Sequence, residues 1–429
     1  MIIGVHGLWH LGIVTCAGLL KLGYEVVAYD RNSNVIGDLE NFKLPVHEPG
    51  VIEILQKYRE QIEFTNDLEK LERCEFHWIT YDTPVNEFDE AEPETVIQEI
   101  LNWYEKSNFE GEVIISSQLP IGSTERIRNK IDELNPNNTT HLNIQPENLR
   151  LGKGLETFLN PDRVVIGVES GLISPIIDDV FSKLGKPVIY MKAESAEMVK
   201  HALNAYLATS VTFMGEIAQI CEATGANAHE VKLGLKSDLR IGAKSYLNPG
   251  LGFAGGTLAR DVHYLTEIQR HLRPNSLLAS LLPSNVQNND WIYNQIRNVF
   301  PLGREIHILL LGITYTSGTN TLRRSSAVEL AKKLKQDAGI VLYFEEEDIE
   351  FPSDLNQLMS EIKNPMNFYE IDAVVIGKKL KIFDDVDFLN QINSAGPYIF
   401  DPAGLLKNQI QLDIFSGRYF MVGVNNDKK

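Results

Sequence analysis

The chain has 429 residues, 43% hydrophobic and 23% charged, which is enough for two or three globular domains with large buried cores. Its formal net charge of −18 argues against a nucleic-acid partner, because binding phosphates needs clustered Lys and Arg. No apolar run approaches the roughly 18 residues of a membrane span, and no secretory signal precedes the first apolar run, so we expect a cytoplasmic protein without membrane contacts.

The cysteines do not form a recognisable site. Cys16, Cys74 and Cys221 are far apart and fit neither a disulfide framework nor the spacing of metal ligands. We expect each to be a small buried hydrophobic residue, and we predict no metal site.

Short apolar runs alternate with helical patterns in the first part of the chain. Strands are expected at 1–5, 25–30, 75–80, 112–117, 163–169 and 187–191, with a helix at 11–22 after the first strand. Such alternation predicts βαβ units and a parallel sheet.

The pattern then changes and later returns. Residues 192–224 predict one long helix, of a length that usually bridges domains or forms an interface, and a helical stretch continues to about 299. After 301 the alternation resumes, with strands expected at 305–313, 340–344, 372–377 and 397–404, which predicts a second, smaller α/β domain.

A glycine motif follows the first strand. Gly7-Leu8-Trp9-His10-Leu11-Gly12 opens a helix, and the second strand ends in Asp30. Backbone amides at a helix N-terminus bind a pyrophosphate, and an acidic residue about 20 positions later binds the ribose hydroxyls. The motif predicts NAD, which Asp30 favours over NADP. Trp9, however, stands where a glycine normally lets the backbone approach the pyrophosphate, and a non-binding α/β domain is the alternative.

Seven blocks in order make the chain resemble UDP-glucose and related nucleotide-sugar 6-dehydrogenases. They lie at 7–30, 47–51, 81–92, 145–167, 196–227, 238–261 and 312–334. The resemblance implies α/β architecture: two Rossmann-like doubly wound domains joined by a long central helix and a helical dimerisation core. The expected boundaries are 1–191 for the NAD-binding domain, 192–300 for the dimerisation domain and 301–429 for a domain that helps hold the nucleotide-sugar. A homodimer or higher homo-oligomer is expected through the long helix, where Ala202, Ala205 and Ala208 permit close packing.

The resemblance also implies a reaction. In such enzymes a sugar alcohol is oxidised to an aldehyde, a cysteine captures the aldehyde, and a second oxidation and hydrolysis release a uronic acid. Matching positions assign the catalytic residues Glu147, Lys200, Asn204 and Asp261. Lys200 and Asn204 are four residues apart, so they share one helix face and could polarise an oxygen at the reacting carbon. Asp261 would assist proton transfer.

Several positions depart from the family pattern. In GFAGGTLARD, residues 252–261, Thr257 stands at the position of the nucleophilic cysteine and Arg260 at that of a lysine. Gln118 replaces a threonine, Leu151 a glutamate and Thr316 a lysine. A hydroxyl is a far weaker nucleophile than a thiolate unless a base activates it.

The remaining contacts are also carried over from the family. The cofactor is expected to touch Gly7, Trp9, His10, Leu11, Gly12, Asp30, Thr83, Pro84 and Gln118. The nucleotide-sugar is expected to touch Glu147, Leu149, Lys200, Asn204, Arg240, Tyr246, Gly252, Phe253, Gly255 and Arg323. Structural alternatives stay open: Glu147 as a capping carboxylate, Lys200 and Asn204 as a solvated helix face, Arg240 and Arg323 as surface ion-pair formers, and Tyr246 and Phe253 as packing residues.

Three functions follow from this pattern. The first is an NAD-dependent oxidoreductase acting on the CH–OH group of a nucleotide-sugar, a UDP-sugar above all, limited to one oxidation. The second completes both oxidations through an aldehyde hydrate, with Lys200 and Asp261 activating water. The third is a pseudoenzyme that binds nucleotide-sugar or acts as an assembly partner.

Overall fold

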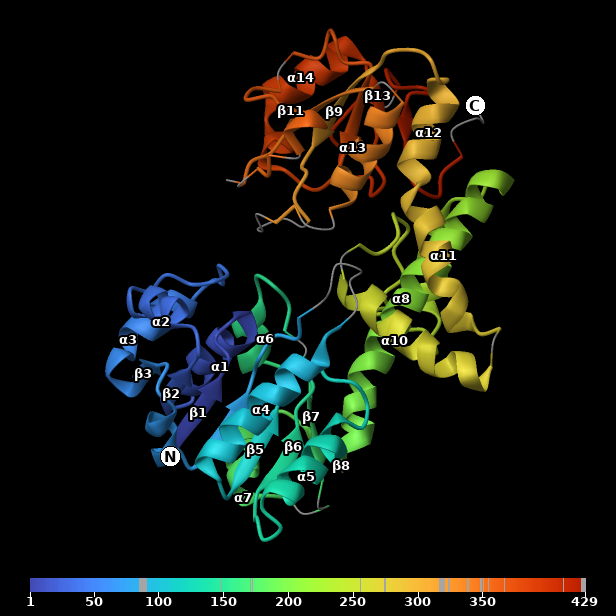
Figure 1. Ribbon diagram of the computed structural model, residues 1–429. Coiled ribbons are helices and arrows are strands. Elements are labelled where there is room, and N and C mark those ends of the chain that lie inside the picture. The colour runs from blue at the N-terminus through green and yellow to red at the C-terminus, as the bar shows by residue number, and fades with distance from the viewer. Residues whose placement is uncertain are drawn as a thin grey trace. The chain divides into compact units, whose positions relative to one another are not determined.

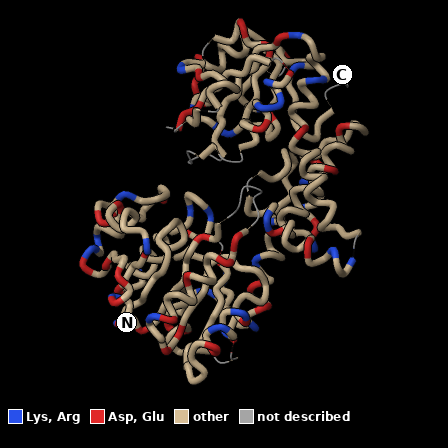
Figure 2. Tube along the Cα trace, viewed as in Figure 1, with Lys and Arg blue, Asp and Glu red and all other residues tan. Residues whose placement is uncertain are grey.

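The computed structural model describes residues 1–84, 91–147, 149–169, 171, 173–254, 256–273, 275–315, 321–322, 325–337, 339–347, 349, 351–353, 355–365, 367–411 and 413–425. The chain forms two compact units, Met1–Ala202 and Leu203–Lys429. Acidic and basic residues are interspersed along both units (Figure 2).

The first unit is built on an eight-stranded sheet in the order β3-β2-β1-β4-β5-β6-β7-β8 (Figure 1). The strands are β1 (Ile2–His6), β2 (Glu25–Tyr29), β3 (Ile62–Thr65), β4 (Phe76–Ile79), β5 (Glu112–Ile115), β6 (His141–Ile144), β7 (Val164–Val168) and β8 (Val188–Lys192). The first six strands follow the 3-2-1-4-5-6 order of dinucleotide-binding domains, whose ligand crevice opens where the order reverses, between β1 and β4.

Helices cover both faces of this sheet. They are α1 (His10–Lys21), α2 (Ser33–Glu40), α3 (Val51–Lys57), α4 (Pro93–Ser107), α5 (Ser123–Leu134), α6 (Gly154–Leu159) and α7 (Pro175–Ser182), with 3₁₀ turns η1 (Arg59–Gln61) and η2 (Leu68–Arg73). Residues of α1, α2, α3, α6 and α7 share one hydrophobic core with the sheet, and residues of α4 and α5 share the other. The unit is therefore a three-layer α/β/α sandwich.

One strand pair departs from the expected all-parallel sheet. β6 and β7 pair antiparallel, with Asn143 opposite Val168 and Ile144 opposite Gly167, whereas the other pairs of this sheet are parallel. The segment between them therefore connects the carboxyl end of β6 to the adjacent amino end of β7 without crossing over the sheet. The loop after β1 lies at this same end of the strands, because β1, β4, β5 and β6 run parallel.

The long helix α8 (Ala193–Thr224) agrees with the expected helix at 192–224 to within one residue, and the boundary between the two units falls inside it. In the second unit, α8 packs closely on α11. A Cβ atom at Gly215 would lie 2.2 Å from the Asn288 side chain, so a larger residue there would displace that side chain.

The second unit holds a six-stranded parallel sheet in the order β11-β10-β9-β12-β13-β14. Its strands are β9 (His307–Leu311), β10 (Ile340–Phe344), β11 (Ser360–Glu361), β12 (Ala373–Ile376), β13 (Tyr398–Phe400) and β14 (Tyr419–Phe420). Its helices are α9 (Ala228–Ser237), α10 (Gly256–Leu272), α11 (Leu277–Asn289), α12 (Trp291–Val299), α13 (Ser326–Gln336) and α14 (Val386–Ala395), with turns η3 (Leu355–Gln357) and η4 (Lys381–Asp384). The predicted α/β fold class, with two sheets and a long helix, is confirmed.

Candidate functional site

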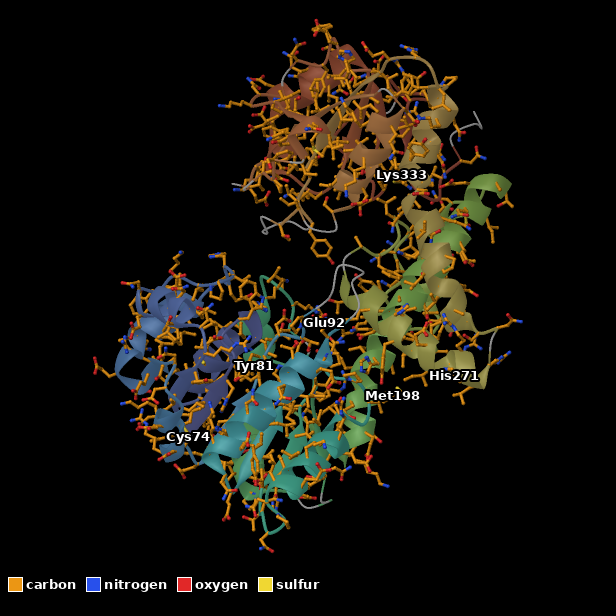
Figure 3. The ribbon with its side chains drawn as sticks, viewed as in Figure 1. Cys74, Tyr81, Glu92, Met198, His271 and Lys333 are labelled. Atoms are coloured by element: carbon orange, nitrogen blue, oxygen red, sulfur yellow. The ribbon has the colours of Figure 1, made fainter. Side chains whose placement is uncertain are left out.

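The loop between β1 and α1 has the geometry of a dinucleotide-binding turn. Gly7 has φ +88°, which favours glycine, and a Cβ atom there would collide with Tyr81, labelled in Figure 3. A Cβ atom at Gly12 would lie 1.9 Å from the Gly7 carbonyl oxygen. Both glycines are therefore required by the turn and by the packing of α1 against it, and the loop fits a dinucleotide at these two positions.

Trp9 stands at the second glycine position of the G-x-G-x-x-G pattern, between Gly7 and Gly12. It is the N-cap residue of α1 with extended backbone, and its side chain makes no capping hydrogen bond. The residue is 49% exposed, so the indole lies at the surface at the end of α1 where a pyrophosphate would bind. The backbone at Trp9 does not itself require glycine, so the fold accepts a large side chain at this position.

His10 begins α1 and binds a carboxylate that sequence reasoning missed. Its Nε2 lies 2.7 Å from Oε2 of the buried Glu48, which also accepts hydrogen bonds from the backbone amides of Gly152 (3.0 Å) and Gly154 (2.6 Å). Glu48 thus ties the start of α1 to the segment that follows Glu147. No short-range pattern connects His10 with Glu48, so this contact was not predictable from local sequence.

Asp30 lies directly after β2, as expected. Its carboxylate accepts hydrogen bonds from the amides of Leu8 and Asn32, both at 2.9 Å, and is therefore held against the glycine loop. This is the position from which an acidic residue binds the ribose hydroxyls.

The other expected cofactor residues come from the loops after β4 and β5. The Thr83 hydroxyl donates to the Gln118 carbonyl oxygen at 2.6 Å, so these two segments meet. Pro84 accepts a hydrogen bond from the Glu92 amide at 2.8 Å. Leu11 lines a cavity of about 50 Å³ together with Glu147 and Leu149.

Glu147 and Lys200 lie in contact. The Lys200 ammonium donates to the Glu147 carbonyl oxygen at 2.7 Å and lies 3.4 Å from its Oε1, while Oε2 accepts the Leu149 amide at 2.6 Å. A cavity of about 20 Å³ beside the pair is also lined by Gln118 and His201. Lys200 is mostly buried and points into the unit, so it is not part of a solvated helix face.

Asn204 and Asp261 form the second pair. The buried Asn204 amide donates to Oδ2 of Asp261, which is also buried and lies on α10. Lys200 and Asn204 are one helical turn apart on α8.

Thr257 lies in the first turn of α10, one turn before Asp261. It is exposed and lines a pocket of about 320 Å³ with Tyr246, Gly252 and Phe253. Thr257, unlike Asp261, is therefore open to solvent in this unit.

An asparagine clamp that the sequence did not reveal holds the glycine-rich loop. The Asn285 side chain of α11 accepts the Phe253 amide at 2.8 Å and donates to its carbonyl oxygen at 2.9 Å. A Cβ atom at Gly252 would lie 2.3 Å from Asn285 Oδ1. Phe253 is buried and Tyr246 exposed, so within this unit Tyr246 is the more accessible of the two rings.

The structure does not bring Arg240 to this pocket. Its guanidinium is 89% exposed and pairs with Asp238, with NH2 at 2.7 Å from Oδ2. Gly255, Thr316 and Arg323 lie outside the described residues. Leu151 is exposed and Arg260 half-buried.

The three cysteines of the chain offer no reactive thiol. Cys16, Cys74 and Cys221 are free and buried, and burial raises the pKa of each thiol, that of Cys74 to about 12. Each thiol therefore stays protonated near neutral pH and is a poor nucleophile. In the described part of the chain, no three His, Cys, Asp or Glu side chains group as metal ligands.

Comparisons with known proteins agree with this geometry. Residues 1–185 match the NAD binding domain of the UDP-glucose/GDP-mannose dehydrogenase family, and residues 194–290 match its central domain. A UDP-glucose 6-dehydrogenase of Rickettsia conorii is 27% identical over 97% of this chain and 98% of its own. The UDP-glucose 6-dehydrogenase TuaD of Bacillus subtilis is 29% identical over 78% of this chain and 73% of its own.

Solved structures share the fold. A UDP-glucose dehydrogenase from Pyrobaculum islandicum superposes with a TM-score of 0.83 at 23% identity, covering 95% of this chain and 96% of its own. A UDP-D-ManNAc dehydrogenase from Pyrococcus horikoshii gives 0.80 at 20% identity, covering 99% and 100%. Among the described helices, none is long and apolar enough to cross a bilayer.

The matched NAD binding domain confirms the predicted cofactor, and the position of Gly7, Gly12 and Asp30 in the structure fits it. The predicted family is confirmed as well, since both matched domains are its own and occur in its order. The chain belongs to the UDP-glucose/GDP-mannose dehydrogenase family of NAD-dependent oxidoreductases.

Proposed function

We propose that this protein oxidises the CH–OH group of a nucleotide-sugar, a UDP-sugar in the first place, and stops after one oxidation. The observation that carries the proposal is the contact between Lys200 and Glu147, because an ammonium held beside a carboxylate can bind and polarise a sugar oxygen. Relatives named UDP-glucose 6-dehydrogenase that align over nearly the whole chain support the choice of substrate.

Each proposed catalytic residue has a task. NAD, held by the Gly7–Gly12 loop and Asp30, supplies the hydride acceptor when bound. Lys200 and Asn204 orient and polarise the oxygen at the reacting carbon, and Glu147 fixes the Lys200 ammonium. The Asp261 carboxylate, anchored by the Asn204 amide, accepts the proton of the alcohol.

The contacts to the rest of the substrate are proposed from the family pattern. Tyr246, Gly252 and Thr257 line a pocket large enough for part of a sugar nucleotide, and residues 301–429 are proposed to help hold the nucleotide. Arg240 and Arg323 are proposed as phosphate contacts, since the guanidinium fork fits phosphate oxygens. Arg240 must exchange Asp238 for the phosphate to do so.

Two observations favour a second candidate, a pseudoenzyme that binds nucleotide-sugar without turnover. Thr257 stands in place of the nucleophile, and Trp9 lies at the surface where the pyrophosphate would approach. A protein of this kind would keep the Asn285 clamp and the pocket but not the reaction.

NADH formation distinguishes the two. Purified protein is mixed with NAD and, in turn, UDP-, GDP- and TDP-sugars, and absorbance at the NADH band is followed, with Asp261→Asn as the inactive control. NADH that depends on one sugar and on Asp261 supports the dehydrogenase. Sugar binding by calorimetry without NADH from any sugar supports the pseudoenzyme.

Replacing Trp9 should improve cofactor binding. If the indole obstructs the pyrophosphate, Trp9→Gly tightens NAD binding by about tenfold, because the amides of the α1 N-terminus can then approach the phosphates. Calorimetry measures the change, and Trp9→Phe, which keeps a ring in the same place, serves as the control. Unchanged affinity in Trp9→Gly would show that the loop has adapted to the indole.

A dimer is expected through α8. Of the alanines expected to permit close packing, Ala202 is exposed, whereas Ala205 and Ala208 are buried within the chain. Tyr206, Phe213 and Ile220 are also exposed and are seven residues apart. Large apolar side chains at this spacing form one stripe, which suits packing against a second helix. We expect a dimer in sedimentation at micromolar concentration and a monomer for Phe213→Glu, with Leu272→Glu, an exposed leucine of α10, as the control. A wild-type monomer would contradict this.

A further inference from the structure

Two residues directly after β2 have opposite preferences for a 2′-phosphate. Asp30 has its carboxylate fixed by the amides of Leu8 and Asn32, both at 2.9 Å, and repels a phosphate on the ribose 2′-position. Arg31 follows directly. An arginine near this acid is what accommodates the 2′-phosphate of NADP in dinucleotide-binding domains, since its fork matches phosphate oxygens.

Arg31 is engaged by another carboxylate. Its NH1 forms an ion pair and hydrogen bond with Oε1 of Glu99 on α4. The Arg31 side chain is 66% exposed but that of Glu99 only 18%, so the glutamate is the fixed partner and the arginine the movable one. The pair draws the guanidinium toward α4.

The neighbouring tyrosines show that these charges act on one small region. Burial raises the pKa of Tyr29 and of Tyr81, the Glu99 and Asp30 carboxylates raise both further, and Arg31 opposes them. Tyr81 also lies against Gly7 of the cofactor loop. Two carboxylates and one guanidinium therefore leave a net negative charge beside the loop.

We propose that Glu99 is a cofactor-specificity residue, which acts by holding Arg31 and cancelling its charge so that NADP is excluded. Asp30 alone would oppose a 2′-phosphate while a released Arg31 attracted it. While the Glu99 carboxylate pairs with Arg31, the guanidinium is held toward α4 and its positive charge is compensated. It therefore does not attract the 2′-phosphate. Selectivity for NAD is thus shared between β2 and α4.

The test compares the affinities of NAD and NADP by calorimetry, without any sugar, so that its outcome does not depend on turnover. Glu99→Gln keeps the size of the side chain and removes its charge. We expect NADP to bind about 5- to 10-fold more tightly and NAD to change by less than about twofold, as for one unit charge near the protein surface. Adding Arg31→Ala to Glu99→Gln should abolish the gain.

Glu94→Gln is the matched control. Glu94 lies on the same helix and pairs with an arginine, Arg126 of α5, so the variant removes the same charge and the same kind of ion pair. It should alter neither affinity. NAD binding in every variant reports that the domain is folded.

Three results would overturn the proposal. One is an unchanged NADP affinity in Glu99→Gln. Another is an equal gain in Glu94→Gln, which would reflect net charge alone. The third is weaker NAD binding in Arg31→Ala, which would show that Arg31 already contacts the cofactor and is not withheld by Glu99.

Discussion

One NADH per sugar, with an aldehyde as product, is the result expected from the wild-type protein. The second oxidation is made easy in the family by a thiolate that captures the aldehyde, and Thr257 offers only a hydroxyl there. Burial raises the pKa of the three cysteine thiols, so none of them supplies a thiolate instead. The structure contains the contacts Lys200–Glu147 and Asn204–Asp261, which we propose for the first hydride transfer.

The measurement counts NADH per sugar consumed and identifies the product by mass after a carbonyl trap. Thr257→Cys should raise the count toward two, because position 257 is exposed in the first turn of α10 and a thiol there is open to solvent. Thr257→Ser is the matched control, as it keeps a hydroxyl and should stay at one. Recovery by Thr257→Cys is expected to be incomplete, since Leu151 and Arg260 also depart from the family pattern.

Two NADH per sugar from the wild type, with free uronate, would contradict the one-step reading. The aldehyde would then react as its hydrate, with Lys200 and Asp261 activating water. A uronate product from Thr257→Ser would support the same conclusion. The count therefore separates the two enzymatic readings independently of which sugar is the natural substrate.

Local patterns in the sequence were enough to predict the frame of the site. The Gly7–Gly12 turn, Asp30 at the end of β2 and the long helix follow from glycine spacing, apolar runs and the absence of proline, all of which act over a few residues. The strands β3 and β6 were missed, since IEFT and HLNI are short and mix polar with apolar residues. The antiparallel pairing of β6 with β7 was missed because strand direction depends on partners distant in sequence.

The contacts that hold the site were not predictable for the same reason. Glu48 lies 38 residues from His10 and 106 from Gly154, and Asn285 lies 32 residues from Phe253. Polar residues at such separations give no periodic signal, and the sequence alone does not distinguish a buried glutamate from an exposed one. Family resemblance indicated the residues that we propose to act on the substrate, whereas only the fold revealed the residues that hold them in place.

A buried histidine pair should make the first unit unstable in mild acid. His6 of β1 and His77 of β4 are both fully buried, with His6 Nε2 2.9 Å from His77 Nδ1. The rings of Trp103 and Phe109 pack around them, and Tyr29 and Tyr81 are the titratable side chains whose rings contact His6. Burial lowers the pKa of His77 to about 3, and burial together with His77 lowers that of His6 well below its ordinary value.

The sign of the effect follows from proton binding. Both histidines stay neutral in the folded protein, whereas in the unfolded chain they bind protons below about pH 6.5. The free energy of unfolding is therefore unaffected above that pH and falls as the pH drops from about 6.5 toward 3, the value for His77. Each histidine contributes a slope of about 1.4 kcal/mol per pH unit while only the unfolded state is protonated.

The test of this pair is the slope of the free energy of unfolding against pH. It is measured between pH 7 and pH 4.5 by urea denaturation followed through tryptophan fluorescence. His77→Leu removes one titrating group, so its stability should fall less steeply with acid, by about 1.4 kcal/mol per pH unit, even if its stability at pH 7 is lower. His47→Gln, which removes an exposed histidine of the same unit, should keep the wild-type slope. Carboxylates contribute equally to all three proteins, so the difference between slopes isolates the histidines. Equal slopes in wild type and His77→Leu would mean that the folded protein admits the proton, and that the pair is not held neutral by burial.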